Sequence, residues 1–308
     1  MPRHPGNLFP LLQSQAPHLL EVVNCATYME WIELCCDYEF RKIPGSGPYS
    51  PPRLHVSGAK DAALVHRLLT QPYLGQPAFM LRRTEGSAGI SLPSLWWQWQ
   101  RVSVNTSLLD QTIKSLPDGI KSRLLSMPDK LANDPMATMV RHALGVAKAD
   151  AYLPTLCEEL INGSQCVVIA HHKTVMDMCE TAFRAAGVSW VRVGGDTTPQ
   201  ERVARMRQFQ SGSAQIFLGS LLAVQTGITL TSASRIVILE PGWTGDSNVQ
   251  VVKRIHRISQ TQPCRAQLLV AAGTLEEAVM KQVEAEITMA HTVVDGGTRP
   301  DRDEHLEW

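Results

Sequence analysis

The sequence has no excess of charge of either sign, no long apolar run and no paired-cysteine motif. Its 308 residues hold 29 Lys and Arg against 29 Asp and Glu, which excludes attachment to nucleic acid by bulk charge alone. Its apolar runs are short, such as residues 166–170, so we expect no membrane partner. The start, MPRHPGNLF, lacks an apolar signal core, and the seven cysteines form no Cys-x-x-Cys pair. We therefore expect a reduced protein that is not secreted and has no zinc cluster.

Two regions of different texture follow one another along the chain. Residues 1–145 are irregular and rich in Pro and Trp. Their sequence predicts helices near 28–40 and 59–69, with one or two more within 108–127. Residues 146–290 are regular, and the last segment, 291–308, holds five acids and predicts a mobile tail.

The regular region alternates short apolar runs with helical stretches, a pattern typical of an α/β fold with a parallel sheet. The run at 166–170 predicts a strand buried on both faces. Thr198 to Glu201 form a capping box that opens a helix, and Gly187 ends the preceding one. The predicted strands are 166–170, 189–193, 215–219, 235–239 and 266–270, and the predicted helices are 148–160, 174–186, 199–210, 247–258 and 274–290.

Glycines and hydroxyl side chains follow the third predicted strand. Gly219, Ser220, Gly227 and Thr229 lie in this segment. In open parallel sheets, ligands bind at the carboxyl ends of the strands, and glycines allow backbone amides to approach a phosphate closely. The alternative is an ordinary surface loop.

The stretch 250–260 carries a second candidate site. If 247–258 is one helix, Gln250, Arg254 and Arg257 are spaced 4 and 3 apart and share a face. Two guanidinium groups on one face can converge on the oxygens of a terminal phosphate. A solvated basic face explains the same spacing equally well.

These stretches together resemble the second half of a superfamily-two helicase motor of the sucrose-non-fermenting (Swi/Snf) type, most closely its annealing-helicase branch. Gln250 to Gln260 follows the order of that family's arginine motif, Gln-x-x-Asp-Arg-x-His-Arg-Ile-Gly-Gln. Glu240-Pro241-Gly242-Trp243 resembles the segment before it. Further ordered matches are His171-His172-Lys173, Arg192 to Thr197, Ser220 to Leu230, Gly273 to Glu277, and Phe79 to Thr84 in the first half.

The resemblance implies a fold, a division of the chain and an activity. Residues 146–290 would form a RecA-like C-terminal lobe, residues 1–145 a mainly helical inter-lobe region with a protrusion, and 291–308 an acidic flexible tail. The implied activity is ATP-driven translocation on double-stranded or forked DNA, as in DNA repair or replication. The expected location is the cytoplasm or nucleoid, or the nucleus in a eukaryote.

The resemblance also assigns site residues one by one. Arg254 and Arg257 would be the catalytic arginine fingers at the γ-phosphate of ATP, with Gln250 and Gly227 beside the nucleotide. The residues expected to hold the DNA backbone are Lys173, Gly195, Thr197, Ser220 and Thr229. No metal ligand is expected on this chain.

Some positions depart from the family pattern. Lys253 stands where the family has Asp, Ser259 replaces a Gly, Gly194 replaces an Asp, and Thr244-Gly245 replaces an Asn-Pro. None of these changes removes either arginine.

The phosphate-binding loop of such motors is also missing from these residues. The sequence has no Gly-Lys dipeptide, and its only Asp-Glu pair, Asp303-Glu304, lies in the acidic tail. We therefore expect ATP and Mg²⁺ to be held by a first lobe on a separate polypeptide, and this chain to be inactive alone. The alternative is a non-catalytic DNA- or protein-binding module, a relic of a truncated or split helicase.

Four further features remain. Three of them have two possible interpretations, and the fourth, His256, has a structural one. His171-His172 suggests either a metal site or, as the preferred alternative, a polar contact at the sheet edge. The tryptophans at 96, 97 and 99 would stack on bases or, as we prefer, pack in the core or against a partner lobe. Arg82-Arg83 would touch phosphates or pair with acids. His256 is expected to make a structural hydrogen bond to a neighbouring loop.

Overall fold

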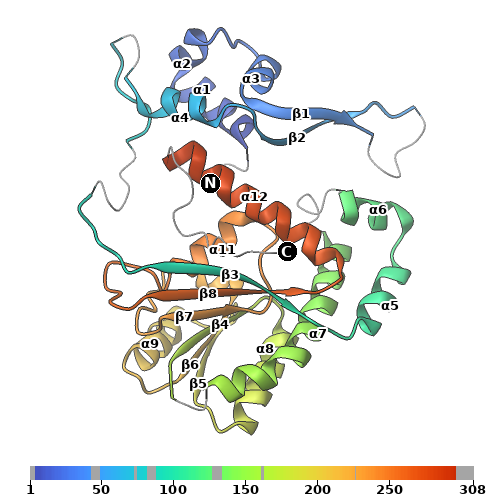
Figure 1. Ribbon diagram of the computed structural model, residues 1–308, viewed down its shortest axis with the longest axis vertical. Coiled ribbons are helices and arrows are strands. Elements are labelled where there is room, and N and C mark those ends of the chain that lie inside the picture. Colours follow the sequence, from blue (N-terminus) through green and yellow to red (C-terminus); the bar gives the residue numbers. More distant parts are fainter. Residues whose placement is uncertain are drawn as a thin grey trace. The chain divides into compact units, whose positions relative to one another are not determined.

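The computed structural model describes residues 4–42, 49–72, 75–81, 88–126, 134–160, 163–225 and 227–295. Two compact units divide the chain: one contains the first 90 residues with the end of the last helix, and the other contains residues 91–281. The sequence predicted a division at 145/146 instead. The difference arises because a strand before residue 145 belongs to the sheet of the second unit (Figure 1).

The first unit is a small helical cluster with one two-stranded antiparallel sheet. Its helices enclose a core around Trp31, whose indole Nε1 donates a hydrogen bond of 2.9 Å to the carbonyl of Pro5. The helix predicted at 28–40 ends at Cys35, and the chain continues as a strand. The elements are η1 (Pro5–Leu8), α1 (Phe9–Gln15), α2 (Pro17–Val22), α3 (Tyr28–Cys35), β1 (Cys36–Arg41), β2 (Arg53–Ala59) and α4 (Ala62–Thr70).

The second unit is an α/β fold built on a six-stranded parallel sheet, as the sequence predicted. The strand order is β3-β8-β7-β4-β6-β5, and every neighbouring pair is parallel. The strands are β3 (Leu95–Val102), β4 (Cys166–Ala170), β5 (Trp190–Val193), β6 (Ile216–Ser220), β7 (Arg235–Ile238) and β8 (Cys264–Ala271). The helices are α5 (Ser107–Ser115), α6 (Asp118–Ser126), α7 (Pro135–Leu160), α8 (Lys173–Ala185), α9 (Pro199–Gln210), α10 (Leu221–Val224), α11 (Gly245–Val252) and α12 (Leu275–Asp295).

The sheet is buried on both faces, as a parallel sheet requires. All five residues of β4 are buried, which confirms the prediction for this strand. Its alternate residues Cys166, Val168 and Ala170 pack with α7 and α8 in one apolar cluster. Val167 and Ile169 are equally buried on the opposite face. This core fixes the carboxyl ends of the strands, where the candidate site residues lie.

The outermost strand, β3, was not predicted. It pairs along its whole length with β8, from Leu95 beside Cys264 to Val102 beside Ala271. Trp97 and Trp99 are buried, in agreement with the preferred core role, whereas Trp96 is 44% exposed. Two indole side chains of this edge strand therefore serve packing.

Two local predictions at helix ends are confirmed. Helix α9 begins with the capping box formed by Thr198 and Glu201, and Gly187 follows α8 with a positive φ of 69°.

All seven cysteines are free and buried. Of the predicted tail 291–308, the first five residues continue α12, and residues 296–308 lie outside the described residues, as do Arg82 and Arg83. No helix in the described ranges combines the length and apolar character needed to cross a membrane.

Candidate functional site

Arg254 and Arg257 lie against the segment that follows β6 and α10. A guanidinium nitrogen of Arg254 donates to the carbonyl of Gln225, and Nη1 of Arg257 donates to the hydroxyl of Thr229 over 2.9 Å. Both side chains are half-buried. The arginine-motif residues and the glycine-containing loop, which the sequence identified separately, therefore form one site at the carboxyl end of the sheet.

The arginines reach this site from turns rather than from the predicted helix. Helix α11 ends at Val252, six residues before its predicted end. The amides of Arg254 and Ile255 bond carbonyls only three residues earlier, and the carbonyl of Arg254 accepts a hydrogen bond from the amide of Leu230 over 3.0 Å. This tertiary bond ends the helix, so the shared helical face predicted for Gln250, Arg254 and Arg257 is wrong.

Gln250 stays on the surface of α11. Its side-chain amide donates to Asp246 Oδ2 over 2.7 Å, one helical turn earlier, and the residue is exposed. Gly227 is exposed and has a φ of 64°, a conformation that favours glycine. A side chain would be strained there, so the loop leaves its backbone uncovered beside the arginines.

The electrostatics around the two arginines suit an anion. Burial lowers the pKa of Arg254, and the positive charge of Arg257 lowers it further. Nε of Arg254 is buried and has no hydrogen-bond partner in the described part of the structure. A buried, unpaired N–H beside a second cation would be satisfied by a phosphate oxygen.

Three of the predicted DNA-contacting residues follow β4 and β5. Lys173 and Gly195 are exposed, whereas Thr197 is buried. The hydroxyl of Thr197 accepts from the amide of Gly194 over 2.9 Å and from Nη1 of Arg205 over 3.3 Å. Lys173 and Thr197 line a cavity of about 600 Å³ between α8, β5 and α9. The Thr197 hydroxyl therefore stabilises the turn between Gly194 and Thr197.

Ser220 and Thr229 use their hydroxyls inside the protein. Ser220 caps α10 by accepting from the amide of Ala223 over 3.3 Å, and Thr229 accepts from Arg257. His256 makes the predicted structural bond, since its Nε2 lies 2.7 Å from the carbonyl of Pro93.

A protein-family model described as the helicase conserved C-terminal domain matches residues 151–259. The ATP-dependent helicase rhp16 of Schizosaccharomyces pombe is 30% identical over 130 residues, 42% of this chain and 15% of that protein. A Drosophila melanogaster protein named SWI/SNF-related matrix-associated actin-dependent regulator of chromatin subfamily A-like protein 1 is 33% identical over 135 residues, 44% of this chain and 18% of its own length. These matches support a Swi/Snf-type helicase C-terminal lobe in this part of the chain.

The chain spans less than one fifth of the length of these two relatives. Among solved structures, the Sulfolobus solfataricus SWI2/SNF2 ATPase core in complex with dsDNA matches 66% of this chain and 47% of its own, at 19% identity and a TM-score of 0.49. The family match covers β4 through the arginine segment, the part of the helicase lobe that holds all the predicted site residues.

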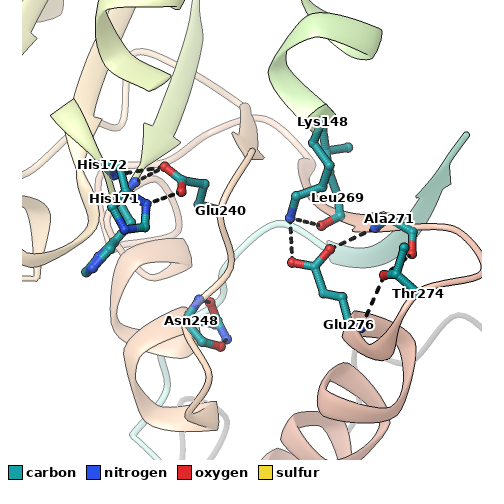
Figure 2. Close-up of polar contacts among 10 residues, drawn as sticks. Lys148, His171, His172, Glu240, Asn248, Leu269, Ala271, Thr274 and Glu276 are labelled. Carbon is teal, nitrogen blue, oxygen red and sulfur yellow. Dashed lines mark hydrogen bonds and ion pairs between the residues drawn. The ribbon is translucent and has the colours of Figure 1, made fainter. Parts of the chain in front are cut away.

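The helicase lobe also contains a buried carboxylate that the sequence analysis did not single out as a site residue. Glu240 follows β7, is 4% exposed, and points toward the exit of β4 (Figure 2). Its Oε2 accepts from the amides of His171 and His172 over 2.6 and 2.9 Å, and its Oε1 lies 2.5 Å from Nδ1 of His172. Since a carboxylate only accepts, Nδ1 of His172 carries the proton.

Opposing effects set the protonation of this cluster. Burial alone would raise the pKa of Glu240, but the hydrogen bonds from His172 and His171 outweigh it and lower the pKa. Burial, aided by the charge of Arg141 and by His172, lowers the pKa of His171 to about 4. Glu240 is therefore an anion at neutral pH and His171 is neutral. In the described ranges, no three His, Cys, Asp or Glu side chains are placed to hold a metal ion.

A second buried charge network joins α7, β8 and α12 (Figure 2). Lys148, fully buried, donates to Oε1 of Glu276 over 2.6 Å and to the carbonyl of Leu269 over 3.0 Å. Oε2 of Glu276 accepts from the amide of Ala271 over 2.8 Å. Both charges are paired and hydrogen-bonded, as burial demands.

Proposed function

We propose that this chain acts as the second lobe of a DNA-dependent ATPase and translocase. In this proposal, Arg254 and Arg257 stabilise the charge that develops on the γ-phosphate of ATP, with Gln250 and Gly227 nearby. The nucleotide and Mg²⁺ are held by a first lobe that lies outside these 308 residues, on a partner polypeptide. These 308 residues contain no Gly-Lys dipeptide for a phosphate loop, so the proposal needs a first lobe from outside them.

The observation that carries the proposal is the convergence of the two arginines on the loop after β6. Arg254 is fixed at Gln225 and Arg257 at Thr229, and the buried Nε of Arg254 has no partner in the described residues. Arginines positioned in this way act in phosphoryl transfer by neutralising charge in the transition state, an effect worth roughly 10³ to 10⁵ in rate.

We propose further that the strand-end loops contact the backbone of double-stranded or forked DNA. Lys173 and Gly195 are exposed beside the cavity at β5. Ser220, Thr229 and Thr197 support these loops through the hydroxyl bonds described above. With this function we infer a location beside DNA, in the nucleus of a eukaryote or the nucleoid of a prokaryote.

DNA-stimulated ATP turnover tests the proposal. The purified chain should show none alone and should gain turnover when the first lobe of a Swi/Snf-type motor is added as a second polypeptide. Arg257→Ala should abolish the gain, whereas Arg207→Ala, at an exposed arginine of α9, should leave it unchanged. Turnover by the chain alone that Arg257→Ala removes would refute the division of labour. Salt-dependent DNA binding without any turnover in the mixture would favour the non-catalytic module.

A further inference from the structure

One buried carboxylate joins the ends of two neighbouring strands. Glu240 stands two residues beyond β7, and it accepts hydrogen bonds from His171 and His172, directly beyond β4. Strands β4 and β7 pair in the sheet. Glu240 therefore fixes the path that the chain takes as it leaves β4 (Figure 2).

The same carboxylate lies at the start of α8. His172 is the N-cap residue of this 13-residue helix, and its own side chain caps no amide of the helix. A negative charge held at a helix N-terminus is stabilising, because the first amides and the helix dipole are positive there. Lys173, the first residue of α8, is exposed one position beyond the clamped segment.

Helix α7 encloses the carboxylate from the other side. A Cβ placed on Gly145 would come within 2.2 Å of Oε1 of Glu240, so only glycine allows α7 to pass this close. The ring of His142 packs edge-on against the ring of His172, with 5.1 Å between ring centroids. Glu240 thus has little freedom to move, and neither has the segment bound to it.

We propose that Glu240 is a positioning residue for DNA binding, which orients Lys173 and the first turn of α8 toward the DNA backbone. The proposal rests on the proposed function, since it needs Lys173 to contact DNA. Glu240 itself touches no DNA in this scheme. It acts by holding the backbone of the two residues before Lys173.

The test is a double-mutant cycle on the affinity for a short fluorescent DNA duplex at low salt. Lys173→Ala and Glu240→Ala should each weaken binding by about tenfold, the scale of one charge-assisted contact. The double variant should bind no more weakly than either single one, because Glu240 acts only through Lys173. Glu240→Gln keeps an oxygen for both amides and should restore binding to within about twofold of wild type.

Two other variants separate positioning from general loss of stability. Glu276→Ala removes a carboxylate that is equally buried but lies away from the β4 exit, and it should leave the duplex affinity of the folded protein unchanged. Gly145→Ala retains Glu240 but displaces it, so it should also weaken duplex binding. It is the variant to use if Glu240→Ala does not fold.

The outcomes distinguish the two proposals. If the wild-type chain does not bind duplex, or Lys173→Ala changes nothing, the DNA contact itself is refuted and the positioning role falls with it. If Lys173→Ala weakens binding but the effects of Glu240→Ala and Lys173→Ala add, or if Glu276→Ala weakens binding as much as Glu240→Ala, only the positioning role is overturned.

Discussion

Nζ of Lys148 lies 2.6 Å from Oε1 of Glu276, and both side chains are almost completely buried. Replacing one partner by an uncharged residue leaves the charge of the other buried and unpaired. Lys148→Met should therefore lower the free energy of unfolding by about 3–5 kcal/mol. Combining it with Glu276→Gln should restore part of that loss, since no lone charge remains. Urea denaturation of the single and double variants at neutral pH measures both effects, and strictly additive losses would contradict the pairing.

Acid should destabilise the helicase lobe through His171. Its pKa is lowered from 6.5 to about 4 in the folded chain, first by burial and then by the charge of Arg141. As the pH falls through 6.5, the unfolded chain binds a proton that the folded chain refuses until near pH 4. The free energy of unfolding should therefore decrease between these values.

Glu240 extends this loss to lower pH. Its folded pKa lies below the ordinary 4.5, so its contribution to the free energy of unfolding is complete above that value and disappears as the pH falls through the folded pKa.

The His171 prediction is tested by urea denaturation across a pH series. The free energy of unfolding should change less steeply between pH 6.5 and 4 for His171→Asn than for wild type. Parallel curves would show that His171 titrates normally.

Two glycine-to-alanine substitutions in helices should change the free energy of unfolding in opposite directions. Gly145→Ala in α7 should lower the free energy of unfolding by about 1–3 kcal/mol, because the added methyl meets Glu240 at 2.2 Å. Gly119→Ala in α6 has no atom within 4 Å of the new Cβ and should gain up to about 1 kcal/mol from helix propensity. Thermal unfolding of both variants gives the comparison, and a stabilised Gly145→Ala would refute the close approach of α7.

DNA affinity should depend on salt through Lys173. If its ammonium neutralises one phosphate, Lys173→Ala should reduce the slope of log affinity against log salt by about 1. Lys114→Ala, at an exposed lysine in the last turn of α5, should leave the slope unchanged. Fluorescence anisotropy at several salt concentrations provides the measurement. Equal slopes for both variants would show that Lys173 does not contact the DNA backbone.

Local patterns in the sequence predicted local structure well. The uninterrupted apolar run of β4 and the capping box of α9 reflect neighbouring residues, and both lie where expected. The helix before the arginines was predicted too long, because its end depends on a bond between Leu230 and Arg254, far apart in the chain. A spacing argument contains no information on such a contact.

Long-range pairing also explains the two features that sequence analysis missed. Glu240 bonds a residue 69 positions earlier. Its sequence signals were its place directly after a predicted strand and in the segment Glu240-Pro241-Gly242-Trp243, and neither signal indicates that contact. Strand β3 pairs with β8 across more than 160 residues. Its three tryptophans indicated burial but not a strand. The structure does bring Arg254 and Arg257 to the segment that holds Gly227 and Thr229, whereas the role of these residues at a nucleotide stays a prediction.

The position of β3 bears on how this lobe is expressed. The family match begins at residue 151, inside α7 and well after β3. A recombinant domain cut at that boundary would lose the outer strand and leave the eight-residue β8 with unpaired amides and carbonyls along one side. An uncovered strand of this kind invites pairing with a second molecule. A domain intended to stay monomeric and soluble should therefore begin before Ser94, whose carbonyl accepts the amide of Cys264 at the first rung of the pairing.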